Sequence, residues 1–90
     1  MYELFYTTKF KKDLKRFKND FDLIGEVLKI LQAQGVKGIP EKMRPHRLKG
    51  EFKGSWECHI KPDLLIIWFQ IEEPKKITLV RIGSHSDLFR

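Results

Sequence analysis

Three histidines lie in the second half of this 90-residue chain, each close in sequence to a carboxylate or an arginine. They are His46, His59 and His85, and the carboxylates of interest are Glu57 and Asp63. Histidine suits both proton donation and proton acceptance because its unperturbed pKa lies near neutrality, and a nearby carboxylate stabilises its charged form. An isolated surface histidine usually has no role. The neighbouring charged groups therefore make these five residues the candidate catalytic group.

Such a group fits the cleavage of RNA without a cofactor. The ribose 2′-OH attacks the adjoining phosphate, one group takes its proton, another protonates the departing 5′ oxygen, and a cation stabilises the phosphoryl oxygens. Arg81 can supply that cation through its planar guanidinium, and Phe89 can stack on a base. These residues together predict a metal-independent endoribonuclease.

A structural zinc site is an alternative use for three histidines and an aspartate. No pair of these residues has HxxxH or CxxC spacing, so the sequence gives little support for a metal site. The single cysteine, Cys58, alternates with Trp56 and Ile60, and we interpret it as a buried small hydrophobe rather than a nucleophile.

Charge and composition narrow the class of protein. Eighteen Lys and Arg against twelve Asp and Glu leave a net charge of +6, which favours a polyanionic partner or serves only solubility. The lysines of residues 9–18 are equally compatible with RNA contact and with a solvated helix face. One cysteine excludes an intrachain disulfide, and the sequence contains neither a signal-peptide pattern nor an apolar run of membrane-spanning length. We expect one domain over residues 1–90, located in the cytoplasm.

The first half of the chain predicts one strand and two helices. Residues 2–6 are rich in aromatic side chains and predict a short strand. A helix follows, with its apolar stripe at i, i+4 and i+7 formed by Phe10, Leu14 and Phe17. We expect Asn19 and Asp20 to break this helix and cap a second one, which Gly35 ends. The short connection between the two helices predicts an antiparallel helical hairpin.

The second half predicts a sheet. Residues 55–60 alternate apolar and polar side chains, with Glu57 and His59 on the polar side. Residues 64–71 are nearly all apolar, as expected for a central strand covered on both faces, and residues 76–82 form the last strand. The order β-α-α-β-β-β predicts an α+β fold in which the helical hairpin covers one face of a twisted antiparallel sheet. The candidate catalytic group would then gather on the other, partly open face.

Three segments resemble the YafQ-type branch of the RelE/ParE toxin superfamily. They are His46–Gly50 (HRLKG), Glu57–Asp63 (ECHIKPD) and Gly83–Phe89 (GSHSDLF). Their order and spacing agree with the family pattern, as does the helical hairpin ahead of them, so the resemblance covers essentially the whole chain. It implies a RelE-like fold and the toxin half of a type II toxin–antitoxin pair, an mRNA interferase that cuts messenger RNA on the ribosome and inhibits translation.

The same resemblance implies an active site and its roles. Its members are His46, His59, Asp63 and His85, with Glu57 beside them. His85 would be the general acid for the leaving oxygen, while the base and the phosphate-holding group stay open among the others. Arg81 would face the scissile phosphate, and Phe89 would pack against the nucleotide or set the His85 rotamer.

Partners and alternatives follow from the family. A cognate antitoxin encoded in the same operon would place a flexible acidic segment on the basic toxin, and operator DNA would be bound only through the antitoxin. The other implied partners are mRNA and the ribosome, and no membrane is expected. Two alternatives share the fold: a ParE-like inhibitor of DNA gyrase, and a non-catalytic module that binds RNA or the ribosome.

Overall fold

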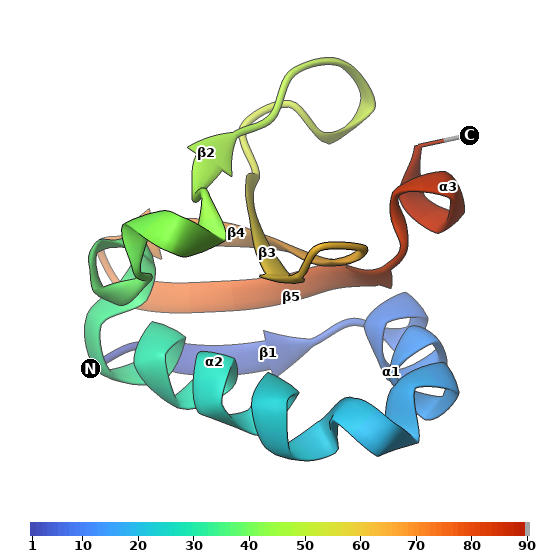
Figure 1. Cartoon of the computed structure of the whole chain (residues 1–90). Coiled ribbons are helices and arrows are strands. Elements are labelled where there is room, and N and C mark those ends of the chain that lie inside the picture. Colours follow the sequence, from blue (N-terminus) through green and yellow to red (C-terminus); the bar gives the residue numbers. More distant parts are fainter. Residues whose placement is uncertain (90) are drawn as a thin grey trace.

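The computed structural model describes residues 1–89 and shows a five-stranded sheet with its two longer helices packed on one face (Figure 1). The strands are β1 (Glu3–Tyr6), β2 (His46–Arg47), β3 (Trp56–Lys61), β4 (Leu64–Glu72) and β5 (Lys75–Gly83). The helices are α1 (Thr8–Leu14), α2 (Phe21–Gln34) and the one-turn α3 (His85–Leu88). Short 3₁₀ segments lie at Lys15–Asp20 (η1), Gly35–Gly38 (η2), Glu41–Met43 (η3) and Gly50–Phe52 (η4). The predicted α+β class is confirmed.

Local side chains set where the first two helices begin and end. The hydroxyl of Thr7 accepts a hydrogen bond from the main-chain N–H of Phe10 at 3.1 Å, which caps α1. Gly35 ends α2 as predicted, with a φ of 67°. A Cβ at this position would lie 2.8 Å from the ring of Tyr2 and from the side-chain nitrogen of Gln70, so only glycine fits the turn.

The predicted capping of α2 by Asp20 is wrong. Asp20 makes no capping hydrogen bond, and its Oδ1 instead accepts from Lys61 Nζ on β3 at 3.1 Å. The reason is that η1 runs directly from α1 into α2, with a kink at Phe17 (φ −124°, ψ 41°). The main-chain N–H groups at the start of α2 therefore follow directly on the turns of η1. Asp20 has no exposed helix N-terminus to cap.

The sheet has the order β1-β5-β4-β3-β2 and is mixed rather than wholly antiparallel. β2 to β5 pair antiparallel with their neighbours, but β1 pairs parallel with β5, with Leu4 opposite Ile77. No tight turn joins β1 to its partner, because the whole chain lies between them, so their relative direction is not constrained to be antiparallel. The predicted central strand is confirmed as β4.

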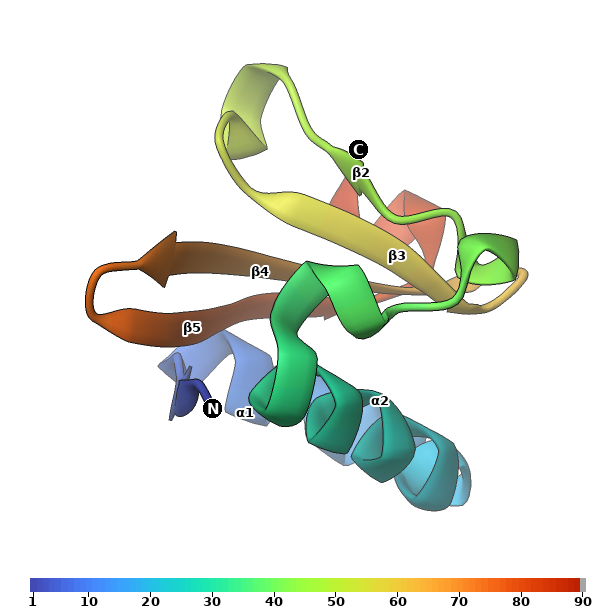
Figure 2. The same cartoon turned by 90° about the vertical axis from the view of Figure 1, so that its left-hand side faces the viewer.

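Both faces of the sheet carry packed apolar side chains. The larger cluster lies between the sheet and the helices and includes Phe10, Leu31, Ile66 and Trp68, all fully buried. On the opposite face a smaller cluster surrounds Leu65, Ile67 and Leu88, and Leu48, Phe52, Val80 and Phe89 pack against it. The segment with β2 and η4 rises on this side of the sheet (Figure 2). This face is therefore less open than the alternation pattern predicted. No helix within residues 1–89 is both long and apolar enough to cross a bilayer.

We expect Cys58 to be unreactive in the native protein. It is fully buried on β3, and burial, with a smaller contribution from the charge of Glu57, raises the pKa of its thiol to about 12. The thiol is therefore protonated at neutral pH, and the thiolate is the reactive form. Iodoacetamide at pH 8 should leave the folded protein unmodified by mass spectrometry and alkylate it once urea is added. Modification without denaturant would contradict this burial.

Candidate active site

The strand register places the candidate residues near one end of the sheet. His46 on β2 lies opposite Glu57 on β3, and this row continues through Ile67 to Arg81 on β5. His59 lies opposite Leu65, whose partner on β5 is Gly83. Since successive strand residues alternate faces, Glu57 and His59 share the face that carries Leu65 and Ile67. The candidate residues on β2 and β3 therefore lie on the side of the sheet away from α1 and α2.

His46 is held at both ring nitrogens. Its Nδ1 lies 2.8 Å from the carbonyl oxygen of Arg44, and its Nε2 lies 3.1 Å from Glu57 Oε1. Arg44 adopts the left-handed conformation, with φ 56° and ψ 55°, which turns its carbonyl toward the ring. A non-glycine residue in this conformation is uncommon and costs free energy. The backbone here is thus arranged to orient the His46 ring.

These two contacts define the protons that the His46–Glu57 pair must hold. A carbonyl oxygen only accepts, so Nδ1 carries a proton. A carboxylate also only accepts, so the Nε2–Oε1 contact needs a second proton, carried by one of these two atoms. Both ring nitrogens of His46 are therefore engaged in hydrogen bonds. In this arrangement neither nitrogen has a free lone pair with which to accept a proton from RNA.

Glu57→Gln should remove the proton shared between His46 Nε2 and residue 57. A glutamine amide can donate to Nε2, so the ring with its proton on Nδ1 alone then satisfies both contacts. Ring ¹⁵N shifts should show a hydrogen-bonded proton at both ring nitrogens in the wild type and at Nδ1 alone in the variant. Glu51→Gln, an exposed change on η4, is the control and should leave the His46 shifts unaltered. A bare Nε2 in the wild type would contradict the proton count.

Glu57 lies deeper than the sequence pattern predicted. Its side chain is only 5% exposed, because the segment with β2 and η4 covers this part of the sheet, and its Oε2 is buried with no hydrogen-bond partner among the described residues. The expectation that Glu57 points into an open face is therefore wrong. A buried carboxylate cannot touch an RNA strand directly, so its influence on one must pass through His46, whose side chain is 48% exposed.

A second pair joins Asp63 to His85. Asp63 lies in the turn between β3 and β4, and its Oδ1 accepts a hydrogen bond from the main-chain N–H of His85 at 3.1 Å. His85 is the first residue of α3 and is exposed to solvent. Its ring lies 5.0 Å from that of Phe89 between centroids, and Phe89 also meets the edge of Phe52 at 5.7 Å. Phe89 therefore supports the position of the His85 ring.

Arg81 is occupied by a partner that the sequence analysis did not foresee. Its Nε and Nη2 donate to the two carboxylate oxygens of Asp13 at 2.7 and 3.1 Å. These hydrogen bonds raise the pKa of the Arg81 guanidinium, and its side chain is only 22% exposed. Arg81 thus braces β5 against α1 in this structure. To bind a phosphate as well, the Arg81 guanidinium would need a further N–H group beyond the two that donate to Asp13.

Asp13 carried a signal that the sequence analysis missed. It is the one acidic residue between positions 9 and 18, and it falls beside the apolar stripe of its helix rather than on the basic faces. A lone carboxylate at a buried helix position indicates a buried cationic partner. Asp13 also accepts from the main-chain N–H of Ile82 at 3.1 Å, which satisfies the edge of β5 beyond the end of β1.

The candidate residues do not form a compact set of metal ligands. Within residues 1–89, no group of three or more His, Cys, Asp and Glu side chains is placed to hold a metal ion. What the arrangement offers is proton transfer: an imidazole at His46 that shares a proton with Glu57, an exposed imidazole at His85, and the side chains of His59 and Asp63 nearby along the chain.

Comparisons with known proteins identify the family of this chain. The family model described as a bacterial toxin of type II toxin–antitoxin systems, YafQ, matches residues 2–90. The mRNA interferase toxin YafQ of Escherichia coli K12 is 25% identical over 87 residues, which cover 93% of this chain and 91% of that one. A metal-bound toxin from Helicobacter pylori is 38% identical, with a TM-score of 0.82 over 99% of this chain and 100% of that one. A chain of the E. coli DinJ–YafQ complex is 26% identical, with a TM-score of 0.81 over the full length of both chains. The chain therefore belongs to the YafQ family of bacterial toxins from type II toxin–antitoxin systems.

Proposed function

We propose that this toxin is an endoribonuclease that cleaves mRNA on the ribosome by metal-independent attack of the 2′-OH. The observation that carries the proposal is the exposed His85, whose main-chain N–H is held by Asp63 at the same end of the sheet as the His46–Glu57 pair. A related E. coli protein is an mRNA interferase toxin. Transesterification needs two proton transfers, which His85 and either His59 or Asp63 can supply, and the attacking nucleophile belongs to the RNA itself.

The roles divide according to what each group can offer. His85 donates the proton to the departing 5′ oxygen. His46, oriented by Glu57 and by the carbonyl of Arg44, stabilises the phosphoryl oxygens in the transition state. The base that takes the 2′ proton is then His59 or Asp63, because both ring nitrogens of His46 are already engaged in hydrogen bonds. Arg81 and Phe89 bind substrate, Phe89 by packing on the nucleotide or by fixing the His85 rotamer.

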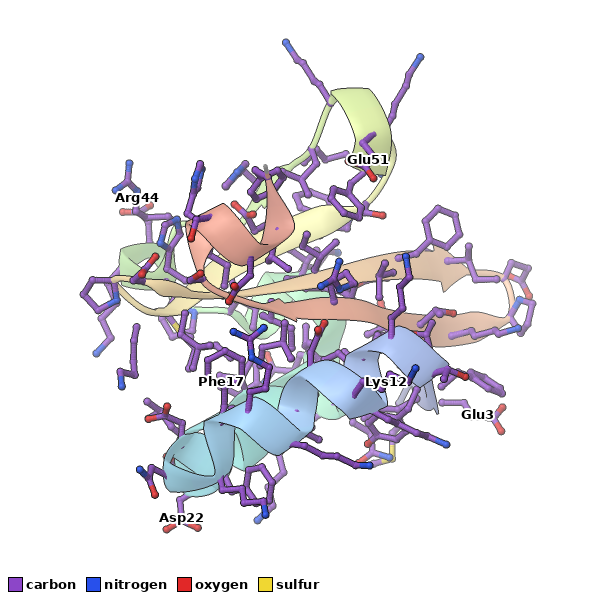
Figure 3. The ribbon with its side chains drawn as sticks, turned by 90° about the vertical axis from the view of Figure 1, so that its right-hand side faces the viewer. Glu3, Lys12, Phe17, Asp22, Arg44 and Glu51 are labelled. Atoms are coloured by element: carbon purple, nitrogen blue, oxygen red, sulfur yellow. The ribbon has the colours of Figure 1, made fainter. Side chains whose placement is uncertain are left out.

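Charge on the adjoining helix supports an RNA substrate. Six of the chain's 18 Lys and Arg lie between residues 9 and 18, and all six are exposed; we call them the α1–η1 basic face. Their one acidic neighbour, Asp13, is neutralised by Arg81. α1 and α3 face the same side of the molecule, with Lys12 on α1 (Figure 3). Phosphates bound there would lie on the side of the molecule that carries His85.

The antitoxin is proposed by analogy with the E. coli complex of DinJ and YafQ. We infer a cognate antitoxin from the same operon, with an acidic segment that folds onto this basic toxin and blocks the site. Operator DNA would be contacted only through that antitoxin.

Cleavage on programmed ribosomes tests the proposal. Bacterial ribosomes carrying a short end-labelled mRNA are incubated with the toxin in a buffer that keeps their structural Mg²⁺, with 1,10-phenanthroline added to remove transition metals from the toxin. We expect cleavage of the mRNA, its loss on addition of the antitoxin, and a translation block in cells that express the toxin. An intact mRNA, or a DNA-damage response without a translation block, would overturn it.

A further inference from the structure

The helix that carries His85 is too short to hold itself in place. α3 spans only four residues, His85–Leu88, and an isolated helix of this length is unstable in water. Its position therefore depends on contacts made at its ends and on the burial of Leu88, which is 4% exposed and packs against Leu65 and Ile67. Several of these contacts are made by Asp87, which plays no part in the proton transfers described above.

The two carboxylate oxygens of Asp87 face different elements. Oδ2 accepts from the main-chain N–H of Ser84 at 3.0 Å, while Ser84 Oγ accepts from the main-chain N–H of Asp87 at 3.1 Å, a reciprocal capping box. Oδ1 lies 3.4 Å from Nη2 of Arg16 on η1. One carboxylate thus closes the first turn of α3 and links it to the α1–η1 basic face.

Gly83, at the end of β5, lies in close contact with the side chain of Asp87. A Cβ added at Gly83 would lie 3.1 Å from Asp87 Cβ, 3.2 Å from its Oδ2 and 3.4 Å from Leu88 Cδ2. The end of β5 and the side chain of Asp87 are therefore in close contact, and a methyl group at Gly83 would require Asp87 or Leu88 to move. The chain passes from β5 into α3 across this contact, and His85 is the first residue of α3.

We propose that Asp87 is a positioning residue that holds α3, and with it the His85 imidazole, in the orientation needed for cleavage. The expected fall in kcat rests on the proposed ribonuclease function, whereas the expected loosening of α3 does not. A misplacement of about 1 Å in a reacting group can cost on the order of 10²-fold in rate. Loss of Asp87 should therefore lower kcat and leave KM unchanged, since the RNA-contacting surface is intact.

The test compares four variants in the ribosome cleavage assay. Asp87→Ala removes the cap and should lower kcat by at least about 10-fold, with KM within twofold of wild type. Asp87→Asn retains an oxygen for the Ser84 N–H and should recover most of kcat. Gly83→Ala displaces Asp87 from the other side and should resemble Asp87→Ala. Asp22→Ala removes the same charge from the exposed start of α2 and should behave as wild type.

Amide exchange gives a readout that does not require cleavage. The N–H groups of Leu88 and Phe89 donate to Ser84 O and His85 O, so they should exchange faster in Asp87→Ala than in wild type or Asp87→Asn. Unchanged amide exchange in Asp87→Ala would overturn the proposal, whether or not the wild type cleaves RNA. A wild type that cleaves no RNA would by itself remove only the proposed ribonuclease function. A wild-type kcat in Asp87→Ala, or an equal loss in Asp87→Asn, would also overturn it.

Discussion

Replacing His85 with alanine should slow RNA cleavage by about 10²- to 10⁴-fold, the range for a lost general acid. The ring is exposed and contacts Phe89, so its removal opens no cavity in either apolar cluster. The hydrogen bond to Asp63 uses the main-chain N–H of residue 85, which alanine retains. The loss should therefore fall on the chemical step, and the cleavage rate on programmed ribosomes measures it.

The first control is a test that His85→Ala keeps the wild-type fold. Far-UV circular dichroism and the midpoint of thermal unfolding should match those of the wild type. Glu3→Gln, an exposed change on β1 at the opposite edge of the sheet from β2, should cleave at the wild-type rate. A His85→Ala protein that is folded and cleaves within threefold of the wild type would remove His85 from the mechanism.

Replacing Asp13 with alanine should lower the free energy of unfolding by about 3 kcal/mol. Asp13 is 7% exposed and accepts hydrogen bonds from Arg81 and from the main-chain N–H of Ile82. Its removal leaves a poorly exposed guanidinium and a buried N–H unpaired, which costs more than the net value of the ion pair. In a chain of this length the expected fall in Tm is roughly 15 °C.

Two further variants show whether the unpaired charge is the cause. Lys12→Ala, next to Asp13 but on the exposed face of α1, should change stability by less than about 0.5 kcal/mol. Asp13→Ala combined with Arg81→Leu removes the stranded charge and should recover part of the loss. A loss below about 1 kcal/mol in Asp13→Ala would mean that the pair behaves as an ordinary surface ion pair. Urea unfolding of the four proteins provides the comparison.

The fold could be predicted from the sequence wherever an element was long enough to show its period. The alternation in residues 55–60 and the apolar run of 64–71 correspond to β3 and β4. The stripe of the first helix corresponds to α1 at Phe10 and Leu14, whereas Phe17 falls at the kink in η1. β2 and α3 escaped prediction because two and four residues are too few to display a period. The parallel pairing of β1 was also missed, since nothing local to residues 2–6 specifies the direction of a partner so distant in the chain.

The candidate site was predictable in its residue types but not in its hydrogen bonds. Spacing and resemblance identified His46 and Glu57, yet their direct contact depends on β2, and the orientation of the His46 ring depends on the left-handed backbone at Arg44. A non-glycine residue gives no sequence sign of that conformation. Asp87 is different, because the pattern Ser84-x-x-Asp87 is a recognisable capping signature that the sequence analysis passed over. The residue roles themselves stay predictions.

The chemistry at the cleaved ends of the RNA tests the central claim most directly. The toxin is given an mRNA on programmed ribosomes that keep their structural Mg²⁺, with 1,10-phenanthroline present to remove transition metals, alongside the same mRNA with a single 2′-deoxy nucleotide at the cleavage position. The account predicts that the all-ribose mRNA is cut to a fragment ending in a 2′,3′-cyclic phosphate or its 3′-phosphate hydrolysis product, and that the 2′-deoxy mRNA stays intact. Cleavage of the 2′-deoxy mRNA, fragments with 3′-hydroxyl ends, or activity that returns only with added metal would contradict it.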